Sequence, residues 1–163
     1  MPTQEQPEVL RQQRYAEAMR YMSNAKETLQ KARKEDDYYA DAKYVQTACG
    51  TAYNGVLLAL NAYLELRGVE MPKKKRRSIE FYTSSVAAID GGLLKELNSV
   101  YNILHLSGYY DGEKDARVIR IGFDTAHKII DRLKPAHPVD PAAWAAKPRS
   151  PSLARRLYSM FFA

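Results

Sequence analysis

Apolar side chains recur every three or four residues along most of this 163-residue chain, a spacing typical of amphipathic α-helices. Two segments, at about 8–35 and 113–134, each carry a single such stripe. The first stripe is Tyr15, Ala18, Met22, Ala25, Leu29 and Ala32, and the second is Ala116, Ile119, Phe123, Ala126, Ile130 and Leu133. We therefore predict a helix with one buried face in each segment.

The segment at about 39–67 carries two neighbouring stripes, which predict a helix that packs on more than one side. Small residues form one stripe: Val45, Ala48, Ala52, Gly55, Ala59, Ala62 and Leu66. Bulkier residues form the other: Cys49, Tyr53, Val56, Leu60 and Tyr63. We expect this helix to be central in the fold. Gly68 should end it, and Pro72 prevents helix formation in the loop that follows.

Two shorter helices are predicted between that loop and the last helix. One spans 78–89 with Ser78 as its N-cap, and the other spans 93–106 with Leu94, Leu97, Tyr101 and Leu104 facing inward. The segments 90–92 and 108–112 are read as turns. No strand-like alternation of useful length occurs, so the predicted class is all-α.

The predicted domain is therefore an antiparallel bundle of about five helices over residues 8–134. Residues 135–163 form an irregular extension, with a Pro-rich linker and a short amphipathic segment at 153–162. We expect that segment to dock onto the protein, with Trp144 as a second anchor.

The net charge of +6 is concentrated in one loop and in the C-terminal extension. The loop carries five consecutive cations, Lys73, Lys74, Lys75, Arg76 and Arg77, and the rest of the helical body is close to neutral. This distribution argues against a broad nucleic-acid face and favours local basic patches. The run is a candidate phosphate-binding or nucleic-acid-binding site, and a solvated loop is the alternative.

Other composition features favour a cytoplasmic protein without integral membrane association. The single cysteine, Cys49, excludes an intrachain disulfide and is expected to be a buried small hydrophobe. The first residues are polar, and no apolar run approaches the roughly 18 residues of a membrane span.

Candidate catalytic chemistry is sparse. The acidic residues at 35–37 and Asp41 read as a helix connection with caps, because no His or Cys stands at ligand spacing. Gly91-Gly92 lacks the Lys-Ser/Thr of a phosphate loop. We therefore predict no metal and no cofactor. Arg120 and His127 lie about 10 Å apart along one helix, too far for a single site.

Three segments carry a resemblance to the HEPN superfamily, over about residues 14–134. They are Asn24–Leu29, the stretch from Lys43 to Gly68, and Gly108-Tyr-Tyr-Asp111 with the helix at 116–130. The chain also resembles a group of small bacterial helical proteins without an assigned function. HEPN membership implies a helical bundle, often a homodimer, that acts as a ribonuclease, as the partner of a nucleotidyltransferase in toxin–antitoxin pairs, or as a non-catalytic binding module. We expect this chain to form a homodimer.

The Arg-x4-His pair of HEPN ribonucleases falls on Asn102 and Ser107, just before Gly108 and Tyr109. Neither residue supplies a group that titrates near neutrality or a cation for the phosphate. We therefore expect a non-catalytic HEPN-like binding or interaction module, with nucleic acid, a nucleotide or a nucleotidyltransferase as its partner.

The alternative is a ribonuclease or toxin–antitoxin component with a displaced pair, such as His105 with Arg117 or Arg120. His105 follows the inward-facing Leu104, so we expect a partly exposed or hydrogen-bonded histidine. The tyrosines at helix ends suit either a binding groove or ordinary bundle edges.

Overall fold

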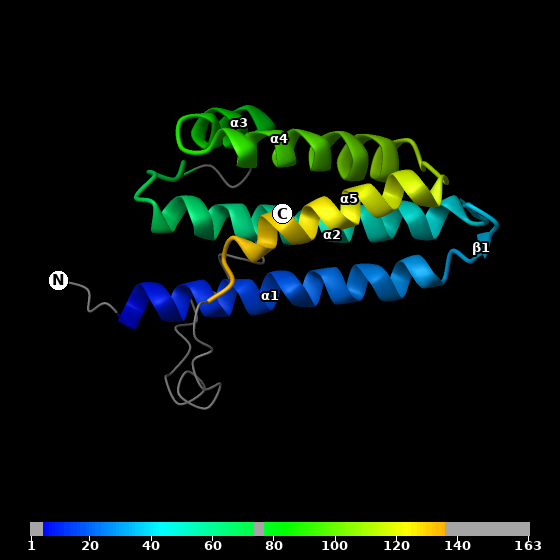
Figure 1. The fold of residues 1–163 in the computed structure, drawn as a ribbon, viewed down its shortest axis with the longest axis horizontal. Helices are drawn as coiled ribbons and strands as arrows, with labels where there is room; N and C mark the ends of the chain where they lie inside the picture. The colour runs from blue at the N-terminus through cyan, green and yellow to red at the C-terminus, as the bar shows by residue number, and fades with distance from the viewer. Residues whose placement is uncertain (1–4, 74–76, 136–163) are drawn as a thin grey trace.

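The computed structural model describes residues 5–73 and 77–135, and this part of the chain is predominantly helical. Figure 1 shows α1 and α2 side by side, α5 crossing α2, and α3 with α4 along the far side of α2 from α1. The elements in chain order are α1 (Glu5–Gln30), β1 (Lys34–Glu35), β2 (Tyr38–Tyr39), α2 (Ala42–Leu66), α3 (Ile79–Ala87), α4 (Gly91–Val100), the π-helix η1 (Tyr101–Tyr110) and α5 (Ala116–Asp131). The predicted all-α bundle is confirmed.

A two-stranded hairpin joins α1 to α2, in place of the helix ends expected there. Lys34 pairs with Tyr39 and Glu35 with Tyr38. The backbone is left-handed at Arg33, just before β1, and at Asp36 in the turn, with φ of 53° and 56°. The predicted start of the second helix at about residue 39 was wrong, because Tyr38 and Tyr39 form β2 and α2 begins only after its N-cap, Asp41.

The same hairpin also holds the start of α5. The Tyr39 amide donates to the Lys114 carbonyl at 2.8 Å, and the Ala116 amide donates to the Asp37 carbonyl at 2.8 Å. Residues some 75 positions apart are thereby joined, so the hairpin supports the segment that leads into α5.

Helix α2 is the centre of the core, as its two stripes predicted. Thirteen of its residues are buried, including Val45, Cys49, Ala52 and Val56, and α1, α5 and η1 each pack against it. Gly68 ends the helix with φ of 75°, where its missing Cβ permits the left-handed conformation.

The predicted N-cap of α3, Ser78, is confirmed, whereas residues 90–92 are not the expected turn, because Asp90 caps α4, which begins at Gly91. The Ser78 hydroxyl accepts from the Phe81 amide, and the Asp90 carboxylate accepts from the Leu93 amide. The Asp90 carboxylate also forms an ion pair with the guanidinium of Arg132, at the C-terminus of α5, at 2.6 Å. The same guanidinium lies 3.2 Å from the Glu96 carboxylate. One arginine therefore ties the N-cap and the middle of α4 to the end of α5.

The largest departure from the sequence prediction lies between residues 101 and 112. An α-helix to residue 106 and a turn at 108–112 were expected, but the chain forms a π-helix through Tyr110. A π-helix bonds each amide to the carbonyl five residues back, as the Asp111 amide does to Leu106 at 3.0 Å. Such helices are rare beyond a single turn and occur often at functional sites.

The predictions for residues 136–163, including the linker, Trp144 and the amphipathic segment, lie outside the described residues. Among the helices that are described, none combines the length and the apolar composition that a membrane span requires.

Candidate functional site

Histidine 105 lies in the middle of five aromatic rings, which we call the aromatic stack: Tyr53, Tyr101, His105, Tyr109 and Tyr110. Its ring centroid is 4.7 Å from that of Tyr53 and 5.2 Å from that of Tyr101, with interplanar angles of 29° in both cases. Tyr109 also stacks with it, at 6.0 Å and 16°, and Tyr110 meets it edge-on at 5.1 Å. These distances are those of favourable ring contacts.

The wide turn of η1 produces this arrangement. Residues four and five positions apart share one face of a π-helix, so Tyr101, His105, Tyr109 and Tyr110 align along it. Two glycines bring this face close to α2. A Cβ at Gly108 would lie 2.5 Å from the Cys49 sulfur, and one at Gly50 would lie 3.0 Å from the Tyr109 ring.

Burial shifts the pKa values of His105 and Tyr53 in the stack and of Cys49 beneath it. It lowers the pKa of His105 below the ordinary 6.5, so the imidazole is neutral at pH 7. Burial also raises the pKa of Tyr53 and raises that of the Cys49 thiol to about 12. The stack therefore offers neutral aromatic faces, and Cys49 is an inert thiol, as expected from its apolar stripe.

The outer end of the stack is open to solvent. Tyr110 is 64% exposed, Tyr109 45% and the neighbouring Leu106 37%. Large apolar side chains clustered at one place on a surface suit contact with a partner or ligand better than contact with water.

A line of partly or fully exposed residues on α2 continues from the stack, and we call it the α2 stripe. Its members are spaced by three or four: Lys43, Thr47, Gly50, Asn54, Leu57 and Asn61. The opposite side of the helix is buried, with Val45, Ala52 and Ala59 among its members. Since Tyr109 lies over Gly50, the aromatic stack forms a border of the stripe.

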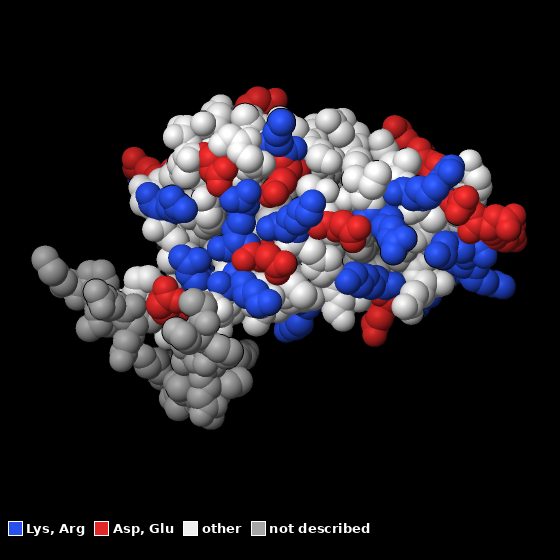
Figure 2. Space-filling view, in the orientation of Figure 1, with Lys and Arg blue, Asp and Glu red and all other residues white. Residues whose placement is uncertain are grey.

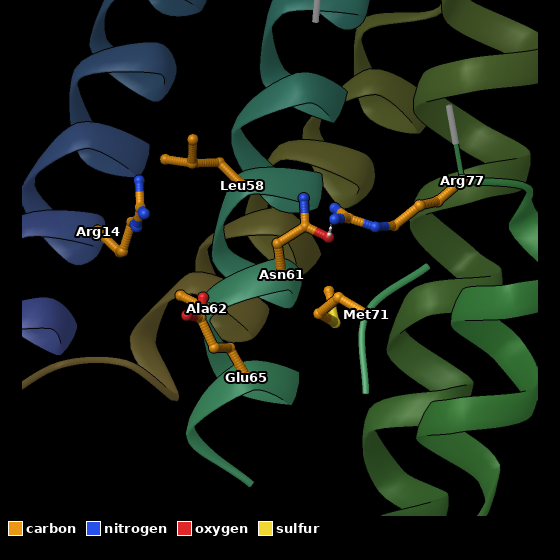
Figure 3. A pocket seen from close by; sticks show the side chains of 7 residues that line it. All are labelled: Arg14, Leu58, Asn61, Ala62, Glu65, Met71 and Arg77. Atoms are coloured by element: carbon orange, nitrogen blue, oxygen red, sulfur yellow. Dashed lines mark hydrogen bonds between the residues drawn. The ribbon is translucent and has the colours of Figure 1, made fainter. Parts of the chain in front are cut away.

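A small cavity of about 60 Å³ lies at the far end of the α2 stripe, and we call it the arginine pocket. Figure 3 shows Arg14 of α1 on one side of Asn61 and Arg77 on the other. The Asn61 carbonyl oxygen accepts from Arg77 at 2.8 Å and from the Tyr82 hydroxyl at 2.9 Å. The remaining lining residues are Leu58, Ala62, Glu65 and Met71.

Two residues of the predicted basic run, Lys73 and Arg77, are described, and they have different surroundings. Lys73 is exposed, Lys74, Lys75 and Arg76 lie outside the described residues, and Arg77 turns inward to Asn61. Arg77 is therefore the described residue of this run that contacts the α2 stripe, through Asn61. Arg14, which has no motif or charge cluster around it in the sequence, adds the second guanidinium.

The residues at the HEPN motif positions, Asn102 and Ser107, and the two that follow, Gly108 and Tyr109, differ from one another in burial and contacts. Asn102 is exposed, and Ser107 is half-buried with its carbonyl accepting from the Glu113 amide at 2.9 Å. Gly108 forms the contact with Cys49, and Tyr109 belongs to the aromatic stack. Gly108 and Tyr109, the two positions after the motif, therefore contribute to the candidate binding surface.

The displaced catalytic pairs do not come together within the described ranges. Arg117 pairs with Asp115 at 3.0 Å and lies 3.9 Å from Asp37, and no hydrogen bond or ion pair joins His105 to Arg117 or Arg120. On the face of Figure 2, acidic and basic side chains alternate over α1 and α5 without a large patch of one sign. No cluster of three metal-ligating side chains occurs in residues 5–73 or 77–135.

Comparison with known proteins identifies the family. The model of a family described as a domain of unknown function, DUF5618, matches residues 13–135. The chain belongs to the DUF5618 family. This match supports the expected group of small bacterial helical proteins. It spans the bundle from α1 to the end of α5, so the aromatic stack and the arginine pocket both lie inside the DUF5618 domain.

A solved structure with the same fold is a protein of unknown function from Dyadobacter fermentans. It is 41% identical to this DUF5618 chain, with a TM-score of 0.67, and the alignment covers 76% of this chain and 94% of that one. Among curated proteins, none matches this sequence.

Proposed function

We propose that this DUF5618 protein is a non-catalytic binding module that holds single-stranded nucleic acid along the α2 stripe. The observation that carries the proposal is the aromatic stack, which presents Tyr109 and Tyr110 to solvent beside a line of small and polar residues. Proteins that bind single strands combine such stacking platforms with cations that track the phosphates.

Cations lie at both ends of the stripe. Lys43 is exposed at one end, and Arg14 and Arg77 line the pocket at the other. Gly50 and Asn61 are eleven residues apart, which is about 16 Å along the helix axis, so a short oligonucleotide spans the distance between base stacking and the arginines.

Fluorescence anisotropy with a labelled single-stranded oligonucleotide tests the role of the basic run. We expect weak binding whose affinity falls with salt by a slope of roughly −0.7 per phosphate contact. Replacing Lys73, Lys74, Lys75 and Arg76 with Gln should reduce both the affinity and the slope. An unchanged slope would show that these four cations take no part in binding.

The HEPN-like assignment, the nucleotidyltransferase partner and the cytoplasmic location remain predictions that accompany this proposal. A ribonuclease built on His105 with Arg117 or Arg120 receives less support, because both arginines lie on the α5 side of the bundle and His105 is surrounded by tyrosines. RNA cleavage that is lost in His105→Ala would favour the ribonuclease instead.

Homodimerisation is the second candidate, favoured by the exposed apolar surface of Leu106, Tyr109 and Tyr110. A second copy would cover this surface as a partner does in an interface core. Light scattering at micromolar concentration should then give twice the chain mass, and Tyr110→Ala should shift the mass toward the monomer. A monomer mass for the wild type would exclude this candidate.

A further inference from the structure

The arginine pocket presents hydrogen-bond donors from three directions. Arg14 comes from α1, Asn61 from α2 and Arg77 from the segment before α3. The Asn61 carbonyl oxygen is already occupied by Arg77 and Tyr82. Its amide nitrogen has no acceptor among the described residues, so the polar groups available to a ligand are mainly donors.

Arg14 is the unusual member of the pocket. Within residues 5–73 and 77–135 it makes no hydrogen bond and no ion pair shorter than 4 Å, although its side chain is partly buried. Burial lowers its pKa, while the more distant carboxylates of Glu65 and Glu17 oppose that shift. A partly desolvated guanidinium without a close counterion gains free energy when an anion binds beside it.

The volume of the arginine pocket limits which chemical groups it can hold. One water needs about 10–15 Å³ of such volume, so about 60 Å³ holds a group of four or five heavy atoms. A phosphate head fits this volume, whereas a phosphodiester flanked by two sugars does not. Leu58, Ala62 and Met71 make the rest of the lining apolar.

We propose that the arginine pocket binds the terminal phosphate of a nucleic-acid strand, with Arg14 and Arg77 as its cations and the Asn61 amide as a further donor. This inference rests on the proposed function for the rest of the strand, which would lie along the α2 stripe toward Tyr109. Guanidinium groups suit this ligand because their planar donors match phosphate oxygens.

Glu65 places a carboxylate at the rim, so the charged lining residues are two cations and one anion. A bound phosphate would be repelled by this carboxylate. The pocket therefore predicts opposite effects for two neighbouring substitutions: Arg14→Gln weakens phosphate binding, and Glu65→Gln strengthens it.

The experiment compares one oligonucleotide sequence with a 5′-phosphate, a 3′-phosphate or no terminal phosphate, by anisotropy at fixed salt. We expect wild type to prefer one phosphorylated end by roughly tenfold or more, as for a charge-assisted hydrogen bond. Arg14→Gln should lose this preference, so that it binds the three oligonucleotides with equal affinity. The control is Arg20→Gln, since Arg20 is an exposed cation of α1 that pairs with Glu17.

A second measurement tests the pocket without any nucleic acid. Inorganic phosphate should raise the melting temperature of wild type above its value in chloride at equal ionic strength, and Arg14→Gln should lose that rise. If oligonucleotides do not bind but this rise depends on Arg14, the proposed function fails and the pocket is a site for free phosphate. Equal responses of wild type and Arg14→Gln in both measurements would overturn the inference.

Discussion

Gly108 lies where η1 touches α2, and the contact leaves no room for a side chain. An added Cβ would approach the Cys49 sulfur to 2.5 Å and the Ile103 carbonyl to 3.1 Å. Gly108→Ala should therefore destabilise the protein by about 1–3 kcal/mol, as overpacking does in a core. The measurement is the urea midpoint at constant m-value.

Gly91 supplies the control for that substitution. It begins α4, and a Cβ there would meet nothing within 4 Å. Gly91→Ala should be neutral or slightly stabilising, within about 1 kcal/mol. Equal stability of the two variants would mean that η1 and α2 are not in close contact at Gly108.

The lowered pKa of His105 makes stability depend on pH. The unfolded chain binds a proton at a pKa near 6.5, and the folded chain binds it only at lower pH. Stability should therefore fall as the pH drops below about 6.5, because the unfolded state takes up the proton first. His105→Phe keeps an aromatic ring and removes this contribution, so its loss of melting temperature between about pH 7 and pH 5 should be smaller than that of wild type.

At the scale of single elements, apolar spacing predicted the helices because each buries one side of a regular α-helix. Ile119, Phe123, Ala126 and Ile130 are buried as expected, and Ser78 and Asp41 lie at the caps. The π-helix was missed because Leu97 and Leu104 also fit α-helical spacing. The π-helix packs closely on α2 through its own Gly108 and on α5 at Gly122, and single-sequence periodicity contains no such tertiary information.

The aromatic stack was missed for the same reason. The sequence marked its tyrosines as candidates for a groove or for bundle edges, and it marked His105 as partly exposed. The π-helical turn brings Tyr110 to the face of Tyr101 and His105, whereas in an α-helix Tyr110 would lie on another side. Arg14 gave no sequence signal, because a single arginine in an amphipathic helix usually lies on a solvated face.

Arg132 carries the connection between α4 and α5. Its guanidinium contacts both Asp90 and Glu96, and the three side chains are each about 25–30% exposed. Arg132→Met should lower the melting temperature, and high salt should reduce the difference from wild type only in part. Arg120→Met, an exposed site on the same helix, should melt like wild type. If Arg132→Met and Arg120→Met had the same melting temperature, Arg132 would not connect α4 to α5 in the way proposed.

The whole molecule has two different sides around α2. The face in Figure 2, over α1 and α5, is covered by charges of both signs, which suits solvation. The α2 stripe lies on the other side of the helix from the buried residues that meet α5, and it combines aromatic rings with the arginine pocket. We therefore place binding on the α2 stripe and assign no ligand to the α5 face.

The most direct test of that claim is the affinity of a Tyr109→Ala, Tyr110→Ala double variant for a single-stranded oligonucleotide at low salt. Base stacking contributes about 1–3 kcal/mol per base, so the account predicts a loss of tenfold or more. Ile121→Ala, which truncates an exposed apolar residue of α5, should bind like wild type. An unchanged affinity of the double variant, or an equal loss in Ile121→Ala, would contradict the account.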